Sequence, residues 1–181
     1  MRYRRAFQPG ASYFFTLVTH ERSQIFRGAA TVEVYRRAVR KVQAARSFVL
    51  DAEVILPDHI HLICTLPEGD SDFPTRVRLI KSAFTRSLAD RLRRNKQTHS
   101  RSAKREQPVW QRRYWEHIIR DERDFQSHLD YIHINPVKHG FVTAAREWPY
   151  STFLQWVERG VYDLWWGSDE VPALPEWVGR E

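Results

Sequence analysis

The order of apolar and polar positions along the chain predicts a mixture of strands and helices. Apolar or alternating runs, typical of strands, occur at 12–20, 48–56, 59–66 and 117–120. Apolar residues that recur every three or four positions, typical of amphipathic helices, occur at 31–46, 73–93 and 121–135. We therefore expect the order strand, helix, strand, strand, helix, strand, helix.

The third predicted strand has two faces of different character. One face is apolar and consists of Ile60, Leu62, Cys64 and Leu66. The other face carries His59 and His61, which stand side by side because residues two apart in a strand project to the same side. Pro57-Asp58 precedes them and predicts a tight turn, so the histidines begin the second arm of a hairpin.

The last predicted helix carries polar residues beside its apolar stripe. The stripe is expected to face the core and consists of Phe125, Leu129 and Ile132. Tyr131 and Asn135 lie roughly 100° from the centre of that stripe. Both side chains are therefore expected at a groove along the edge of the core. Pro136 disfavours further helix.

The order of elements predicts the α+β class, in a ferredoxin-like arrangement: an antiparallel sheet with the helices packed on one face. Residues 1–146 are expected to form this domain. Residues 147–181 contain five of the seven tryptophans. They are expected to pack on the same domain as an irregular tail, which either covers a nucleic-acid groove or completes the core. The polar stretch 95–107 predicts a mobile loop.

Length and composition narrow the class of protein. With 181 residues, 42% of them hydrophobic, one domain can bury a sizeable core. No apolar run has the length of a bilayer span and no signal-peptide core follows the N-terminus, so we expect a cytoplasmic, nucleoid-associated protein with no membrane partner. Cys64 is the single cysteine, which excludes an intrachain disulfide.

Positive charge is concentrated in one region of the chain. Residues 77–113 contain twelve Lys or Arg and two acids, whereas the whole chain has a net charge of +7. Aromatic residues accompany the basic ones at 110–115. Positive charge interleaved with stacking surfaces suits single-stranded nucleic acid. A solvated helix face followed by a flexible loop would give the same composition.

The spacing of His59 and His61 suits a metal site. Neutral imidazoles are common ligands of divalent transition metals, and two on one strand face can converge on an ion if a third polar group comes from elsewhere. Alone, such a pair also occurs as hydrogen-bonded histidines on an exposed strand, and Tyr131 alone would be an ordinary packing residue. Together the two motifs suggest a metal beside a nucleophilic tyrosine.

Four segments give the chain a resemblance to a known family. They are Leu-Pro-Asp-His-Ile-His-Leu-Ile at 56–63, Trp-Gln-Arg-Arg-Tyr-Trp-Glu-His-Ile-Ile-Arg at 110–120, Asp-Tyr-Ile-His-Ile-Asn-Pro-Val-Lys-His-Gly at 130–140 and Trp-Pro-Tyr-Ser-Thr-Phe at 148–153. They resemble the REP-associated tyrosine transposases of bacteria, which are HUH endonucleases with one catalytic tyrosine. The resemblance implies a transposase-like nuclease and strand-joining enzyme for single-stranded DNA that bears hairpins of repetitive extragenic palindromes.

The resemblance also implies a role for each motif residue. It makes Tyr131 the nucleophile, which forms a 5′-phosphotyrosine link and leaves a free 3′-hydroxyl. It makes His59 and His61 ligands of Mg²⁺ or Mn²⁺, a metal that would polarise the phosphate. Asn135 is the implied third ligand. Related transposases of insertion sequences often have glutamine at this position, so His128, one turn before the tyrosine, is an alternative.

Basic residues are expected to hold the DNA, so that binding should weaken steeply with added salt. The expected contacts are Arg4, Arg5, Arg78, Lys81, Arg112, Arg113, Lys138 and His139. The resemblance implies a monomer, with a dimer left open. Two rival functions remain: a nucleic-acid-binding protein whose catalytic residues are vestigial, and a metal-dependent phosphohydrolase that uses water as its nucleophile.

Overall fold

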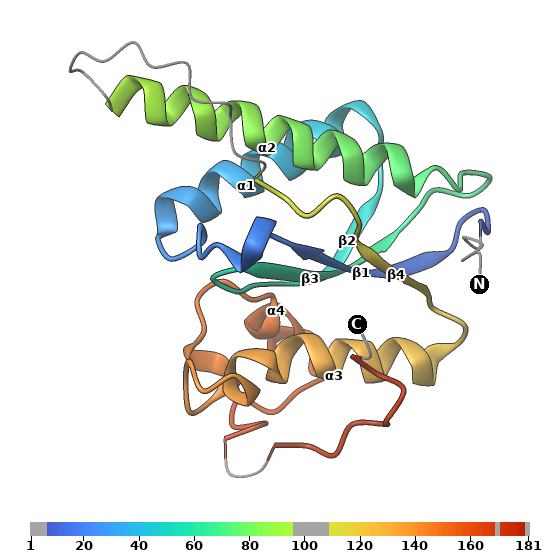
Figure 1. Ribbon diagram of the computed structural model, residues 1–181. Coiled ribbons are helices and arrows are strands. Elements are labelled where there is room, and N and C mark those ends of the chain that lie inside the picture. Colours follow the sequence, from blue (N-terminus) through green and yellow to red (C-terminus); the bar gives the residue numbers. More distant parts are fainter. Residues whose placement is uncertain (1–6, 96–108, 169–170, 180–181) are drawn as a thin grey trace.

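The computed structural model describes residues 7–95, 109–168 and 171–179 (Figure 1). Arg4 and Arg5, and nearly all of the stretch for which the sequence predicts a mobile loop, lie outside these ranges. Within them, no helix is both long enough and apolar enough to cross a membrane.

Four antiparallel strands of the described residues form a sheet with the spatial order β2-β3-β1-β4. The strands are β1 (Ser12–Val18), β2 (Val49–Ile55), β3 (His59–Thr65) and β4 (Trp115–Ile118). β2 and β3 form the predicted hairpin, in which the amide of Leu56 donates to the carbonyl oxygen of His59 at 2.9 Å. β1 lies beside β3 and pairs Thr16 with His61. The register of these two central strands thus places a hydroxyl next to a histidine.

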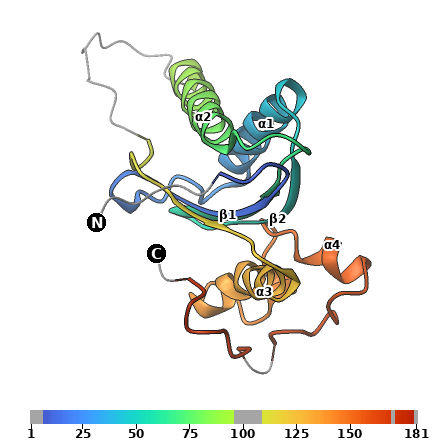
Figure 2. The same ribbon diagram turned by 90° about the vertical axis from the view of Figure 1, so that its right-hand side faces the viewer.

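Helices cover both faces of this sheet (Figures 1 and 2). α1 (Ala29–Ala45) and α2 (Phe73–Asn95) lie on one face, and α3 (Glu122–Lys138) and the short α4 (Phe153–Glu158) lie on the other. Two 3₁₀ helices, η1 (His20–Arg22) and η2 (Ala145–Glu147), lie in the connections. The α+β class and the antiparallel sheet are confirmed. The expected packing of the helices on one face is wrong, because α3 and α4 take the opposite face.

Two separate cores explain why both faces of the sheet are covered. The core under α1 and α2 includes the predicted apolar face of β3, namely Ile60, Leu62, Cys64 and Leu66. The core under α3 contains strand residues that point the other way, together with the apolar stripe of the helix: Phe14, Val54, Ile63, Leu129 and Ile132. Each large apolar side chain gains about 1.5–3 kcal/mol on burial. A second apolar sheet face therefore requires a second helix layer, and α3 supplies it.

α3 extends beyond the proline that was expected to end it. Pro136 lies inside the helix and has no backbone N–H to donate. The carbonyl oxygens of Asn135 and Pro136 nevertheless accept hydrogen bonds from the amides of His139 and Phe141, at 3.0 and 2.9 Å. The helix therefore continues to Lys138, and its last turn reaches the end of the sheet where the histidines lie.

The tail that begins at residue 147 packs on the face that α3 covers. Phe153 of α4, Tyr162 and Trp166 join the second core. The indole N–H of Trp156 donates to the carbonyl oxygen of Asp51 at 3.0 Å, which ties α4 to the edge strand β2. The tail is thus part of the hydrophobic core on this side of the sheet.

Candidate active site

His59 and His61 lie side by side on β3, on the face of the sheet that α3 covers. Their ring centroids are 4.8 Å apart and their planes are nearly perpendicular, at 81°. Both are buried, with 4% and 0% of their surface exposed. Two imidazoles at this separation can ligate one ion.

Each histidine ring is held through its Nδ1 atom. His59 Nδ1 donates to the carboxylate of Asp58 at 2.6 Å. His61 Nδ1 shares a hydrogen bond of 2.9 Å with the hydroxyl of Thr16. Metal-binding histidines commonly have such a partner on the second nitrogen, which fixes the ring orientation and its basicity. Nε2 is therefore the nitrogen through which each ring would bind a metal.

Burial keeps both imidazoles in the neutral form that binds metals. It lowers the pKa of His59, although the neighbouring Asp58 carboxylate partly opposes the shift. Burial also holds the pKa of His61 well below its usual range, and the nearby His59 acts in the same direction. Both shifts favour the neutral ring, in which Nδ1 keeps its hydrogen bond and Nε2 can act as a metal ligand.

Arg22 lies next to this pair and extends the network. Its guanidinium is 3.4 Å from the second carboxylate oxygen of Asp58, and its side chain is 57% exposed. The backbone φ angles of Glu21 and Arg22 are 51° and 50°, a left-handed conformation that non-glycine residues rarely adopt. The hydroxyl of Thr19 lies 2.8 Å from the carbonyl oxygens of Ser23 and Asp58, which stabilises this turn. A strained turn thus places a cationic group at the site.

Tyr131 reaches the histidine pair from α3. Its ring centroid is 5.0 Å from that of His61 and 5.9 Å from that of Phe14, in edge-to-face contacts. The ammonium of Lys138 lies 5.4 Å from the centre of the tyrosine ring. The side chain is 6% exposed. A tyrosine hydroxyl, two imidazoles and a lysine therefore share one small region.

Asn135 lies between two ring contacts that join α3 to β3. Tyr131, one turn earlier, contacts His61, and His139, one turn later, has its ring centroid 5.5 Å from that of His59. Residues four apart share a helix face, so Asn135 faces the histidine pair. Its side chain is fully buried, and neither amide atom has a hydrogen-bond partner among the described residues.

The unsatisfied amide of Asn135 is the observation that tests whether a metal fits here. Leaving such a group buried without a partner costs about 1–3 kcal/mol. A divalent cation beside the two imidazoles would satisfy the amide oxygen. Imidazole nitrogens are ligands of divalent transition metals, and a carbonyl-type oxygen suits Mn²⁺ and Mg²⁺. The residues present therefore fit the metal that the sequence implies.

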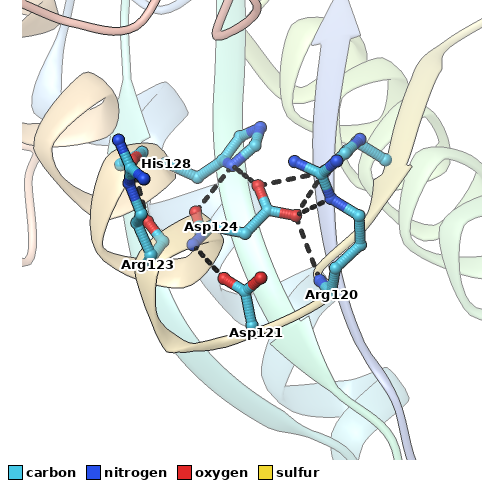
Figure 3. A network of polar contacts seen from close by, with 7 residues as sticks. Arg120, Asp121, Arg123, Asp124 and His128 are labelled. Atoms are coloured by element: carbon cyan, nitrogen blue, oxygen red, sulfur yellow. Dashed lines mark hydrogen bonds and ion pairs between the residues drawn. The ribbon is translucent and has the colours of Figure 1, made fainter.

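A second polar network lies at the junction of β4 and α3 (Figure 3). Asp121 caps the helix by accepting a hydrogen bond of 2.8 Å from the amide of Asp124. The carboxylate of Asp124 accepts from Arg120 Nε at 2.8 Å and from His117 Nε2 at 2.9 Å. His128 Nδ1 donates to the Asp124 backbone oxygen at 2.9 Å. Burial alone would raise the pKa of Asp124, but the bonds from Arg120 and His117 lower it to about 2.

His128 belongs to this second network and not to the histidine pair. Its ring stacks on that of His117, with centroids 4.6 Å apart. The ring of Phe14 contacts His61 at 5.7 Å and His128 at 4.7 Å, and so lies between the two groups. Ligand atoms of His117, Asp124 and His128 lie within 4.8 Å of one another. Because Arg120 and His117 already occupy the carboxylate, we interpret this cluster as a hydrogen-bonded anchor of α3.

The end of the tail lies directly on Tyr131. Val178 is buried in the second core. Gly179 has a φ of +73°, and a Cβ there would overlap the tyrosine ring and lie 3.0 Å from its hydroxyl oxygen. Trp177 packs against His128 and Arg120, at 5.7 and 5.2 Å from its ring. Glycine thus permits a close approach of backbone to the tyrosine.

The basic residues singled out in the sequence are spread over the molecule. Lys138 and His139 lie at the histidine pair. Arg112 and Arg113 are exposed in the segment that leads to β4. Arg78 and Lys81 lie on α2, across the sheet from the site, and Lys81 Nζ donates to the carbonyl oxygen of Gln111 at 2.7 Å. Lys81 therefore anchors the segment that contains Trp110 and Tyr114, whose rings it approaches at 5.9 and 5.8 Å.

Three residues of the site were not predicted from the sequence: Asp58, Thr16 and Arg22. Asp58 has a signal in the sequence, because it directly precedes His59 and so can reach its ring. Thr16 has no such signal, because its contact with His61 depends on how strands β1 and β3 pair. Arg22 has none either, because the turn after β1 brings it to Asp58.

Comparisons with known proteins show which proteins this chain is similar to. A family model described as "Transposase IS200 like" matches residues 8–135. The chain is 42% identical over 168 residues to the REP-associated tyrosine transposase of Escherichia coli (strain K12). The aligned residues cover 92% of this chain and 91% of that relative. A Haemophilus influenzae protein (strain ATCC 51907 / DSM 11121 / KW20 / Rd), provisionally given the same name, is 42% identical over 168 residues, which cover 92% of this chain and 93% of that protein.

The fold is also similar to a solved structure. A REP-associated tyrosine transposase bound to a REP hairpin superposes with a TM-score of 0.80 and 39% sequence identity. The match covers 96% of this chain and 94% of the other. It therefore includes the sheet, α3 and the tail.

Proposed function

This chain belongs to the IS200-like transposase family, whose members are DNA-cleaving enzymes, and we propose that it cuts and rejoins single-stranded DNA through a covalent bond to Tyr131. The observation that carries the proposal is the position of the Tyr131 ring, 5.0 Å from that of His61 in the buried histidine pair. A phosphate bound at the pair lies within reach of a nucleophile on α3.

The proposed substrate is single-stranded DNA that carries a REP-type hairpin. Support comes from the relative whose structure was solved bound to a REP hairpin, at 39% identity over nearly the whole chain. The net charge of +7 suits a polyanionic ligand. Lys138 and His139 lie at the histidine pair and would hold phosphates near the cut. Arg112 and Arg113 are exposed and would make more distant contacts. We propose that the protein acts as a monomer.

We assign His59, His61 and Asn135 as the residues that would hold Mg²⁺ or Mn²⁺. When bound, such a cation would withdraw charge from a non-bridging phosphate oxygen and make the phosphorus more electrophilic. Asp58 and Thr16 orient the two rings through Nδ1. The buried pair also excludes water from one side of the reacting phosphate.

The proposed step is in-line displacement by the tyrosine. The Tyr131 oxygen would form a bond to the phosphorus, which stays attached to the 5′ oxygen of the downstream nucleotide, and the bond from phosphorus to the 3′ oxygen of the upstream nucleotide would break. The tyrosine loses its proton, and the leaving 3′ oxygen takes one up as a hydroxyl. The number of phosphate ester bonds is unchanged, so the reverse attack by a 3′-hydroxyl rejoins DNA without a nucleotide cofactor.

The test is a covalent adduct. The protein is incubated with Mn²⁺ and a labelled single-stranded hairpin from the repeats of its own genome, and the products are separated under denaturing conditions. We expect a protein–DNA adduct that is absent with a chelator and absent in Tyr131→Phe. Tyr162→Phe is the matched control, since its hydroxyl contacts Asp130 at 2.7 Å and not the histidine pair.

Two results would contradict the proposal in different ways. Cleavage without an adduct, retained in Tyr131→Phe, would indicate water as the nucleophile and a phosphohydrolase. Hairpin binding without any cleavage would indicate a binding protein with a vestigial site.

A further inference from the structure

A row of aromatic rings extends outward from the histidine pair. The rings of His139 and Phe141 are nearly parallel, at 26°, with centroids 5.9 Å apart. Phe141 and Trp148 are also nearly parallel, at 28° and 5.4 Å. Tyr150 meets Trp148 edge-to-face at 5.8 Å. We call these four residues the aromatic row.

The aromatic row is continuous with the candidate active site. His139, its first member, has its ring centroid 5.5 Å from that of His59. His139 follows directly after α3, which carries Tyr131. A chain of nucleotides whose phosphate lies at the histidine pair would therefore have its next bases beside the row.

Backbone contacts hold the row in place without any ligand. The indole N–H of Trp148 donates to the carbonyl oxygen of Ile55 at 3.0 Å, and the carbonyl oxygen of Tyr150 accepts from the Ile55 amide at 2.8 Å. The amide of Phe141 donates to the carbonyl oxygen of Pro136 at 2.9 Å. The rings are thus pre-organised, which lowers the entropic cost of binding.

The end of the row nearest the histidine pair is open to solvent. Phe141 is 43% exposed and His139 is also exposed, whereas Trp148 and Tyr150 are half-buried. Trp165 is also exposed but lies outside the row, where the guanidinium of Arg146 is 3.9 Å from the centre of its ring. The exposed cations Lys138 and Arg22 lie at the inner end of the row, near Tyr131 and Asp58 respectively. Exposed rings next to cations at a phosphate-cleaving site have the chemistry of a stacking surface for nucleobases.

We propose that the aromatic row binds the unpaired bases next to the cleaved phosphate by stacking, and so selects single-stranded DNA at the cut. The inference rests on the proposed function, because it needs a nucleic acid at the histidine pair. Phe141 is the central contact, and its role is in binding and positioning. Lys138 and Arg22 neutralise the flanking phosphates.

The test compares two DNA probes and three variants. One probe is a genomic-repeat hairpin with an unpaired extension that contains 2-aminopurine, and the other is the same hairpin without the extension. Phe141→Leu keeps an apolar side chain but removes the stacking ring, Phe141→Tyr keeps the ring, and Trp165→Leu removes an exposed ring outside the row. Affinity and 2-aminopurine quenching are measured in the presence of a chelator, so that cleavage does not interfere.

We expect Phe141→Leu to weaken binding of the extended probe by roughly 5- to 150-fold and to reduce quenching, since stacking on one ring is worth that much per base. Binding of the probe without the extension should not change. Phe141→Tyr and Trp165→Leu should behave like the unmodified protein.

If Phe141→Leu bound the extended probe and quenched 2-aminopurine as strongly as the unmodified protein, the proposed stacking role would be wrong. The proposed function would stand, provided that the adduct still forms. If the unmodified protein bound neither probe, both proposals would be overturned. Circular dichroism of each variant checks that the fold is retained.

Discussion

The histidines of this chain differ in role because their surroundings differ. His61 and His133 are both fully buried and both have a lowered pKa. His61 lies beside a second histidine, a tyrosine and an unsatisfied amide, whereas His133 lies between the rings of Phe153 and Tyr162. The first environment suits a metal and the second suits packing. Residue type alone therefore does not identify the site.

Removing the hydrogen-bond partner of His59, a proposed metal ligand, should weaken metal binding. Asp58→Asn takes away the charge that holds the Nδ1–H of His59, and we expect Mn²⁺ affinity to fall by about 10- to 100-fold. The measurement is titration calorimetry with Mn²⁺. Asp72→Asn is the control, because its carboxylate lies near Arg46 and not at the histidines. Unchanged affinity in Asp58→Asn would remove that residue from the site.

The buried imidazole of His133 should make stability depend on pH. Burial lowers its pKa to about 3, whereas in the unfolded chain it has the usual value of about 6.5. The unfolded state therefore binds a proton first as the pH falls below about 6.5, and the free energy of unfolding decreases by up to about 1.4 kcal/mol per pH unit. In urea unfolding series near pH 7 and near pH 5, His133→Gln should show a smaller decrease. His20→Gln, at a partly exposed position outside both cores, should follow the unmodified protein.

At the scale of elements, α3 holds the site together. Its N-terminus is bound to β4 through Asp124, its centre carries Tyr131, and its last turn carries Lys138. Because the helix continues through Pro136, three successive turns face the histidine strand. A shift of this helix would move the tyrosine, the amide and the lysine together.

Loss of the Asp124 carboxylate should loosen the junction of β4 and α3. Asp124→Asn removes a charged acceptor from Arg120 and His117, and we expect unfolding to cost about 2 kcal/mol less near neutral pH. The lowered pKa means that this stabilisation is present above about pH 4 and is lost as the pH falls toward 2. Thermal unfolding measures the effect. Glu122→Gln, in the same turn, is the control, and equal melting temperatures would contradict the assignment.

At the scale of the whole molecule, the tail closes the face of the sheet that carries the site. We propose that residues 147–181 and residues 1–146 form one folding unit, since Phe153, Tyr162 and Val178 share a core with α3. The same packing brings Gly179 onto Tyr131. Under the proposed function, the reacting phosphate has to approach the tyrosine beside which Gly179 lies.

Displacing the end of the tail should therefore speed the reaction. In Gly179→Ala a methyl group would overlap the Tyr131 ring at a φ of +73°, where an alanine is strained. We expect the tail to move away and the tyrosine adduct to form faster, measured by quenched time courses at saturating hairpin. Gly160→Ala is the control, because it has a similar φ of +75° and open space around it. A slower rate in Gly179→Ala would mean that the tail supports the tyrosine.

The sequence by itself determined the element order, the two faces of β3 and the residue types at the site. These follow from local periodicity, which sets where each side chain points relative to its own backbone. The tertiary structure decided that α3 covers the histidine face, that Thr16 and Arg22 join the site, and that the tail returns to Tyr131. Those outcomes depend on burying both faces of the sheet at once, and contacts between residues far apart in the chain leave no periodic signal along it.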